Sequence, residues 1–298
     1  MFDPWCEQFV RQYSCAGSRR VYTSDLADLV AFLSRTSKAE FSAVTEQVAL
    51  AWRTNLETRA LAPATISRKL TVAKAFFAYL FDLDAPPAGL PSRNPFRRIR
   101  SPRFDRTVGK TPCPGPEEVR RLLRAISPTD RRGRRDLLIL TLLFNQGLRV
   151  SEVARLERSN VMRFGRQTYL SLVGKGGGEV RSVLPHHVAR LLDRHLSEAA
   201  GPRYVFTRLD GGGGGPDRPL AVRVIHRRLK GYARKAGIDP ATVRPHSGRV
   251  FFITQSYLLT RDLERVARAV GHRELATTRR YLRLGSVLED LPARLMHL

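Results

Sequence analysis

The sequence has little cysteine, and this scarcity excludes two kinds of framework. Its 298 residues include three cysteines, Cys6, Cys15 and Cys113, and none of them forms a Cys-x-x-Cys pair. A disulfide scaffold or a structural zinc site needs several cysteines at short spacing. We therefore expect neither, and the composition fits a reducing compartment such as the cytoplasm.

Long hydrophobic runs are also missing. No apolar stretch reaches the roughly 18 residues that a membrane-spanning helix requires. The stretch DLLILTLLF at 136–144 is too short to span a membrane and indicates a buried helix. The first residues, MFDPWCEQFVRQY, carry early acidic side chains and no apolar core, so we expect no signal peptide. No membrane partner is expected.

Acidic residues are few compared with basic ones. The chain has 27 Asp plus Glu against 52 Lys plus Arg, which gives a formal net charge of +25. This excess exceeds what solubility needs and favours a polyanionic partner, most often nucleic acid. An arginine-biased proteome is the alternative explanation. No cluster of Asp and Glu suits a two-metal site, so we predict chemistry without a metal or other cofactor.

The basic charge is unevenly distributed, which divides the chain into three parts. Residues 1–83 have a net charge of +2, residues 84–112 of +5, and residues 113–298 of +18. The middle part is rich in Pro and Arg and lacks periodicity, so it is expected to be an extended linker. A basic linker between two domains suggests a clamp that closes around a DNA duplex.

The part before the linker is predicted to be helical. Apolar residues recur every three or four positions, with caps expected at Thr23 or Ser24 for the second helix and at Thr45 for the third. Four helices are expected, at about 3–15, 24–37, 45–61 and 63–83. We predict a small four-helix domain that either binds DNA or is a plain bundle.

The part after the linker combines helices with one hairpin. Alternating apolar residues over 167–174 and 179–185, joined by the turn KGGG, predict a β-hairpin. The five glycines within 210–217 predict a flexible loop. Helices are expected over 114–126, 134–148, 149–161, 186–200, 221–237, 247–260, 263–272 and 275–284. The predicted fold class is mainly α with a small β-sheet, an N-terminal helical domain preceding a C-terminal α+β domain.

Six polar residues lie at helix starts or turns, where their side chains can converge. His246 and Arg249 are three residues apart at a predicted helix start and share a face. The others are Arg149, Lys175, His272 and Tyr281. Guanidinium groups match the oxygens of a phosphodiester and would neutralise charge that builds on phosphorus. Tyr281 is the candidate nucleophile, and cationic neighbours should lower its pKa from about 10. Lys175, on the hairpin turn, is a candidate proton donor.

This ordered set resembles the tyrosine recombinase (integrase) family. The stretches TLLFNQGLRVSEVARL, GKGGGEVRSVLP, PHSGRV and VGHRELATTRRYLR are similar to the family's motifs, and length and spacing resemble the Xer recombinases. The resemblance implies a core-binding domain over 1–83 and a recombinase catalytic domain over 113–298. It implies that Arg149 and Arg249 hold the scissile phosphate, and that Glu152 supports Arg149. Lys175 would be the general acid, with Tyr281 as the nucleophile.

The remaining implied roles belong to the two histidines, and two positions depart from the Xer pattern. His246 and His272 would bind phosphate or handle protons. Xer-like sequences usually read His-x-Leu-Arg-His, whereas this chain has Gly248 before Arg249, as in a Cre-like stretch, although Cre has Trp at the position of His272. The hairpin has Gly178 where a second Lys is usual.

Each residue alone also has an ordinary structural interpretation. Tyr281 could be a packing residue, Arg149 a charge at a helix start, and His246 a helix cap. Lys175 in a glycine-rich turn is not a Walker A motif. His272 after a glycine could simply end a helix. The specificity of the prediction lies in the ordered set.

The predicted function is site-specific DNA recombination through a 3′-phosphotyrosyl intermediate. A chromosome, plasmid or mobile-element role remains open. The alternatives are a relaxing topoisomerase of the IB type and a DNA-binding protein with an inactive site. The expected partner is double-stranded DNA with a specific, palindromic site, bound by a homotetramer or heterotetramer in the cytoplasm, on the nucleoid. The segment 284–298 is expected to dock on a neighbouring protomer, or alternatively to pack on its own domain.

Overall fold

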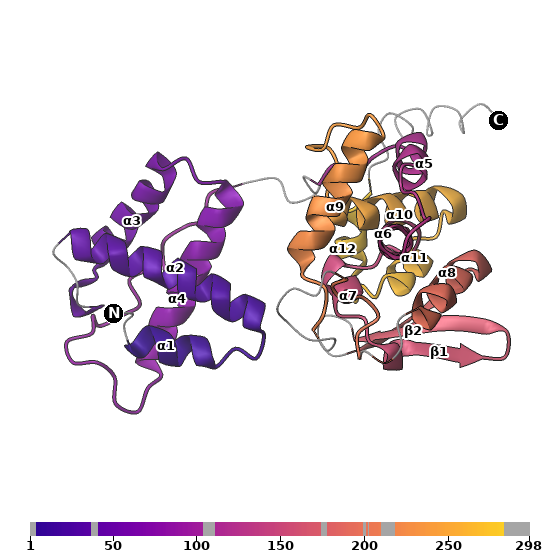
Figure 1. Cartoon of the computed structure of the whole chain (residues 1–298). Coiled ribbons are helices and arrows are strands. Elements are labelled where there is room, and N and C mark those ends of the chain that lie inside the picture. Colours follow the sequence, from indigo (N-terminus) through magenta and orange to yellow (C-terminus); the bar gives the residue numbers. More distant parts are fainter. Residues whose placement is uncertain are drawn as a thin grey trace, which may run out of the picture. The chain divides into compact units, whose positions relative to one another are not determined.

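The chain folds into two compact units, Met1–Asp105 and Arg106–Leu298. The computed structural model, drawn in Figure 1, describes residues 4–36, 41–103, 111–173, 178–198, 201, 203–209 and 218–282. Lys175, the glycine-rich segment 210–217 and the segment 284–298 lie outside the described residues. What was predicted for them stays a prediction.

The N-terminal unit contains the four predicted helices. They are α1 (Pro4–Arg11), α2 (Ala16–Arg35), α3 (Glu46–Thr58) and α4 (Pro63–Phe81), with a short 3₁₀ turn at Phe41–Ala43. Buried apolar side chains from all four form one core around Trp52, Phe76 and Phe77. The predicted cap at Thr45 is confirmed, since its side chain accepts a hydrogen bond from the Val48 amide at 3.4 Å.

The predicted cap at Thr23 or Ser24 is wrong. Helix α2 begins at Ala16 and runs through both residues without interruption. Tyr22 packs edge-on against Tyr13, with ring centroids 4.7 Å apart, and belongs to the core of the unit. This tertiary contact holds the extra helical turns, so the local capping signal does not decide where the helix starts.

The N-terminal unit extends further than the predicted boundary at residue 83. Phe96 and Ile99, inside the stretch predicted to be an extended linker, are buried in the core of this unit. The Phe96 ring lies 5.7 Å from Trp52, and the Asn94 side chain donates a hydrogen bond to the Lys74 carbonyl at 2.9 Å. Two apolar side chains are enough to fix this Arg- and Pro-rich stretch to the unit, because their burial removes them from water.

The C-terminal unit is built around a central helix, α6 (Arg131–Asn145), of which ten of fifteen residues are buried. It contacts helices α5, α7, α8, α9 and α10. The C-terminal unit's other helices are α5 (Pro116–Arg124), α7 (Val150–Ala154), α8 (His186–Ser197), α9 (Val222–Lys235), α10 (Pro245–Thr260), α11 (Leu263–Ala269) and α12 (Leu275–Arg279). A 3₁₀ turn spans Arg158–Asn160.

The sheet is small, as predicted, but has one strand more than the hairpin. Strands β2 (Gln167–Val173) and β3 (Glu179–Leu184) pair antiparallel, with Leu170 opposite Ser182. Strand β1 (Val161–Phe164) pairs with the other edge of β2, and Figure 1 shows β1 and β2 side by side below α8. The extra strand has four residues, too few for a periodic signal.

Helix α7 is shorter than the predicted helix over 149–161. It ends at Ala154, and the chain then pairs with a distant segment. The Val205 amide donates to the Leu156 carbonyl at 2.8 Å, and Glu157 forms an isolated bridge with Tyr204. These tertiary hydrogen bonds replace the helical ones. The mainly α fold class with a small sheet is confirmed.

Among the helices that the structure describes, none is both long and apolar enough to cross a membrane.

Candidate functional site

The first arginine of the site is placed by a tight turn after α6. Gly147 has a φ of +63°, and a Cβ there would lie 2.6 Å from the Phe252 ring, so only glycine fits without a shift. The turn leads directly to Arg149, the residue that caps the N-terminus of α7. Helix α6 ends at Asn145, three residues before the predicted end at 148, and the chain turns at Gly147.

Glu152 holds Arg149 from two sides. Its carboxylate accepts a hydrogen bond from the Arg149 amide at 2.6 Å and pairs with the Arg149 guanidinium, also at 2.6 Å. The side chain of Arg149 stays 27% exposed. The expected contact between these two residues is present, and it aims a partly exposed cation while satisfying the first turn of α7.

Helix α10 carries His246 and Arg249 in its first turns. Pro245 occupies the first helical position, where a missing amide hydrogen costs nothing. Gly248 faces α6 so closely that a Cβ would lie 2.5 Å from the Leu143 carbonyl oxygen. The departure from the usual leucine at this position therefore has a structural reason, because the two helix backbones approach each other here.

Arg249 is buried without a carboxylate partner among the described residues. It is 2% exposed. Its guanidinium donates to the Gly147 carbonyl at 2.8 Å, to the Val270 carbonyl, and to His272 Nε2 at 3.0 Å, while its Nε lacks a partner in the described part of the chain. A buried cation that is solvated only by neutral groups is suited to receive an anion.

His272 is placed by a second glycine turn, between α11 and α12. Gly271 has a φ of +66°, and a Cβ there would lie 2.5 Å from the Val180 side chain on β3. The His272 ring contacts Arg249 through Nε2 and the Thr278 hydroxyl through Nδ1, at 2.9 Å. The turn thus joins His272 to α10, to α12 and to the hairpin strand β3.

Tyr281 lies between the two histidines. Its ring centroid is 5.3 Å from that of His246 and 5.2 Å from that of His272. The rest of the side chain packs on the small apolar cluster formed by Ile253, Val266 and Val270. Tyr281 also acts to raise the pKa of Arg249, which places its phenol close to that guanidinium.

Burial and, after it, the concentration of positive charge lower the pKa of three groups. Burial, and then the nearby Arg149, lower the pKa of Arg249 to about 10, although Glu152 and Tyr281 oppose the shift. Burial, followed by Arg249 and Arg149, lowers the pKa of His272 to about 4. The pKa of His246 is lowered by the same causes. Both histidines are therefore neutral near pH 7.

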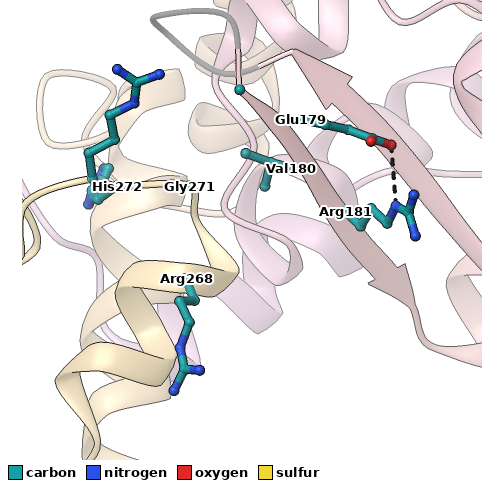
Figure 2. Close-up of a pocket in the computed structure, with 8 residues that line it drawn as sticks. Glu179, Val180, Arg181, Arg268, Gly271 and His272 are labelled. Atoms are coloured by element: carbon teal, nitrogen blue, oxygen red, sulfur yellow. Dashed lines mark hydrogen bonds and ion pairs between the residues drawn. The ribbon is translucent and has the colours of Figure 1, made fainter.

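The structure thus brings five of the six predicted residues together, and Glu152 with them. The sixth, Lys175, lies outside the described residues, between β2 and β3. Figure 2 shows a pocket of about 270 Å³ between β3 and the α11–α12 turn, lined by His272, Arg268 and the Glu179–Arg181 ion pair. The base of the hairpin that carries Lys175 therefore lies beside the site.

Three residues of this region were not predicted. Ser182 on β3 donates to Gln146 at the end of α6, at 3.1 Å, and both line a small pocket with Arg149 and Arg249. Thr278 is fully buried against His272. No local pattern marks Gln146 or Ser182, whereas Thr278 lies three residues before Tyr281 and could have been found by that spacing.

A metal site is not formed by the described residues, among which no cluster of three His, Cys, Asp or Glu side chains could hold an ion. The arrangement offers donors and cations for an anion, two neutral histidines and one phenol. It can bind a phosphodiester and exchange protons around it.

Known proteins share both the sequence pattern and the fold. Residues 115–286 match the phage integrase family. The tyrosine recombinase XerD of Xanthomonas campestris is 31% identical over 240 residues, covering 78% of this chain and 70% of the relative. XerD of Caulobacter vibrioides is 29% identical over 290 residues, covering 94% of this chain and 91% of the relative.

A solved structure shares the fold at low sequence identity. The XerH site-specific recombinase, in a pre-cleavage complex with its difH substrate, superposes with a TM-score of 0.72 at 18% identity, covering 98% of this chain and 84% of that one. The family match spans more than half of the chain and includes Arg149, His246, Arg249, His272 and Tyr281. The chain therefore belongs to the phage integrase family and is a tyrosine recombinase of the Xer type, an enzyme of site-specific recombination.

Proposed function

We propose that Tyr281 is the nucleophile of this recombinase and that it forms a 3′-phosphotyrosyl bond with double-stranded DNA. The observation that carries the proposal is Arg249, a buried guanidinium with no carboxylate partner among the described residues and with Tyr281 and His272 beside it. Arg149, held by Glu152, supplies a second cation from α7. Guanidinium groups bind the oxygens of a phosphate with paired, charge-assisted hydrogen bonds.

The reaction needs one bond formed and one broken at each step. The phenolic oxygen of Tyr281 attacks phosphorus and loses its proton to a neighbouring base, while the bond from phosphorus to the 5′ oxygen breaks. The 5′ oxygen takes a proton from a general acid, for which Lys175 is the candidate. Arg149 and Arg249 neutralise the charge on the non-bridging oxygens, and His246 and His272 bind the phosphate or move protons. Rejoining is the same sequence reversed.

Helix α9 supports DNA as the substrate. Arg223, Arg227, Lys230 and Arg234 recur at helical spacing, and the three arginines are exposed. Such a stripe of cations matches the phosphate backbone, and an α-helix fits the major groove. The XerH complex contains a recombinase bound to its DNA substrate, which agrees with this assignment.

The assembly and the location in the cell belong to the same proposal. Two duplexes and a palindromic site require two-fold related protomers, so a tetramer on DNA is proposed, with the segment 284–298 docking between protomers. The DNA substrate implies a place on the nucleoid. A topoisomerase or an inactive DNA-binding protein is not favoured, because the matched relatives are tyrosine recombinases along most of their length.

A nicked-substrate assay tests the proposal. The full chain is incubated with a pool of nicked duplexes of random sequence, and DNA that stays attached in detergent and is released by protease is sequenced. We expect one palindromic consensus among the recovered DNA, and no adduct with Tyr281→Phe. Tyr257→Phe, a similar change on α10, is the matched control and should still form the adduct.

The other outcomes identify the alternatives. Adducts without a consensus sequence would indicate a relaxing topoisomerase. Binding with a steep salt dependence but no adduct would indicate an inactive site. Adducts that persist in Tyr281→Phe would assign the nucleophile to another residue.

A further inference from the structure

The environment of His272 contains one polar residue that the proposed reaction does not use. Thr278 lies in α12, is 0% exposed, and places its hydroxyl 2.9 Å from His272 Nδ1. Its carbonyl also accepts a hydrogen bond from the Tyr281 amide at 2.9 Å. One buried residue therefore contacts both the histidine ring and the backbone of the tyrosine.

The contacts of His272 define which ring nitrogen carries the proton. A guanidinium group can only donate hydrogen bonds, so the 3.0 Å contact with Arg249 requires a lone pair on His272 Nε2. The ring of a neutral histidine then carries its proton on Nδ1, which donates to the Thr278 hydroxyl. In the opposite tautomer the Nε2–H of His272 would face an N–H of the Arg249 guanidinium, so two donors would meet.

We propose that Thr278 is a positioning residue that fixes His272 as the Nδ1–H tautomer and so keeps its Nε2 lone pair directed at Arg249. This inference rests on the proposed role of Arg249 and His272 at the scissile phosphate. His272 then starts the reaction as a proton acceptor at Nε2. The neighbouring charges favour the same neutral ring, because burial and the cations Arg249 and Arg149 lower the pKa of His272 to about 4.

The groups around His272 on α10, α7 and α12 agree with this assignment. Helix α10 contributes His246 and Arg249, and the N-terminus of α7 contributes Arg149, which Glu152 holds. The Tyr281 ring follows α12, with its centroid 5.2 Å away. Arg249 donates to Nε2, and Thr278 is the contact at Nδ1 in the described part of the chain. Removing the hydroxyl therefore leaves the Nδ1–H without this partner.

The test compares Thr278→Val, Thr278→Ser and Thr277→Val in the full chain labelled with ¹⁵N-histidine. Valine keeps the shape of threonine and removes the hydroxyl, serine keeps the hydroxyl, and Thr277 precedes Thr278 on the same helix. The His272 signals are assigned by their loss in His272→Gln. We expect wild-type, Thr278→Ser and Thr277→Val proteins to show a protonated Nδ1 and an unprotonated Nε2 at neutral pH. Thr278→Val should lose that signature.

Cleavage of a nicked substrate is the second readout. Thr278→Val should slow adduct formation by the bound complex by about 10- to 100-fold, the range known for the loss of a hydrogen-bond partner that orients a metal-binding histidine, with DNA affinity unchanged. Thr278→Ser should restore most of the rate. A wild-type His272 with its proton on Nε2, or a Thr278→Val protein that keeps both tautomer and rate, would overturn the inference.

Two further controls separate possible failures. If Thr278→Val does not fold, the wild-type and Thr278→Ser spectra still decide which nitrogen is protonated. If wild-type protein forms no adduct on any DNA, the proposed function fails, but the tautomer is still read from the spectrum. The two proposals therefore fail through different measurements.

Discussion

The two units differ in whether a buried cation has a carboxylate partner. In the N-terminal unit, Lys69 is 7% exposed and its ammonium lies 3.3 Å from Asp25 and 2.9 Å from Asp28. In the C-terminal unit, Arg249 is 2% exposed and bonds two carbonyls and His272, with no carboxylate partner among the described residues. One buried charge is neutralised inside the fold and the other is not.

The difference does not arise from a general lack of acidic partners in the C-terminal unit. Arg135, on α6, is also 2% exposed, and it pairs with Asp136 at 2.8 Å. The C-terminal unit can therefore neutralise a buried arginine whose role is structural. An arginine that stays unpaired in the same unit indicates a position kept for an external anion. Three predictions test this contrast.

The largest effect is expected at the paired lysine. Lys69→Met removes the buried cation that Asp25 and Asp28 share, and their other partners, Arg68 and Arg59, are more exposed. The free energy of unfolding of the N-terminal unit should therefore fall by about 3 kcal/mol. The chain's two tryptophans, Trp5 and Trp52, both lie in this unit, so urea unfolding followed by tryptophan fluorescence reports it selectively.

A compensating variant completes this test. Adding Asp25→Asn and Asp28→Asn to Lys69→Met removes the two carboxylates that lost their buried cation and should recover part of the lost stability. An unchanged midpoint in the single Lys69→Met variant would mean that the ion pairs contribute nothing. The contrast between the two units would then be lost.

The next effect concerns catalysis and not stability. Arg249→Met should slow adduct formation on a nicked substrate by about 100- to 1,000-fold, the typical cost of removing one donor at a developing oxyanion. Arg249→Lys should also lose activity, because an ammonium group cannot form the two parallel bonds of a guanidinium. Neither substitution leaves a buried carboxylate unpaired, so unfolding should change less than in Lys69→Met.

Single-turnover cleavage and urea unfolding measured on the same samples check this prediction. A rate close to wild type in Arg249→Met would remove the arginine from the reaction. A loss of stability larger than that of Lys69→Met would make Arg249 a structural residue, like Arg135.

The smallest effect is on the pH dependence of stability. The pKa of His272 is about 4 in the folded chain and about 6.5 in an unfolded one, so the unfolded state binds more protons between these values. Stability should therefore be constant above about pH 6.5 and fall as the pH drops toward 4. The slope stays below about 1.4 kcal/mol per pH unit, since solvent screens this half-buried ring.

Urea unfolding followed by circular dichroism at neutral and acidic pH measures this dependence. His272→Gln should remove part of the fall in stability at acidic pH. His246, whose pKa is also lowered, should contribute a further part of that fall. An equal slope in His272→Gln and wild type would show that the cations of the site do not act on His272.

Much of the local structure could be predicted from the sequence. Helices α4, α6 and α10 begin and end close to where apolar periodicity and punctuating residues place them, at Pro63, Gly147 and Pro245. The hairpin of β2 and β3 was also predicted, since alternation over two strands and a glycine turn are local signals. The ordered set from Arg149 to Tyr281 pointed to one site because its members share a chemistry.

Other features could not be predicted because they depend on contacts with another segment and not on the periodicity of the element's own residues. Strand β1 exists through its pairing with β2, and Phe96 is ordered by its contact with Trp52. The start of α2 is held by the contact of Tyr22 with Tyr13. In each case a tertiary contact outweighs a local preference.

The amino-acid sequence by itself determined which helices form, and it supplied two guanidinium groups, two imidazoles and one phenol in a fixed order. Only the tertiary structure decided that Arg249 would be buried with no carboxylate partner among the described residues and that the proton of His272 would lie on Nδ1 toward Thr278. The reason is that periodicity reports the hydrogen bonds and burial of neighbours in the chain. The protonation and solvation of a side chain depend instead on groups such as the Gly147 carbonyl, 102 residues away from Arg249.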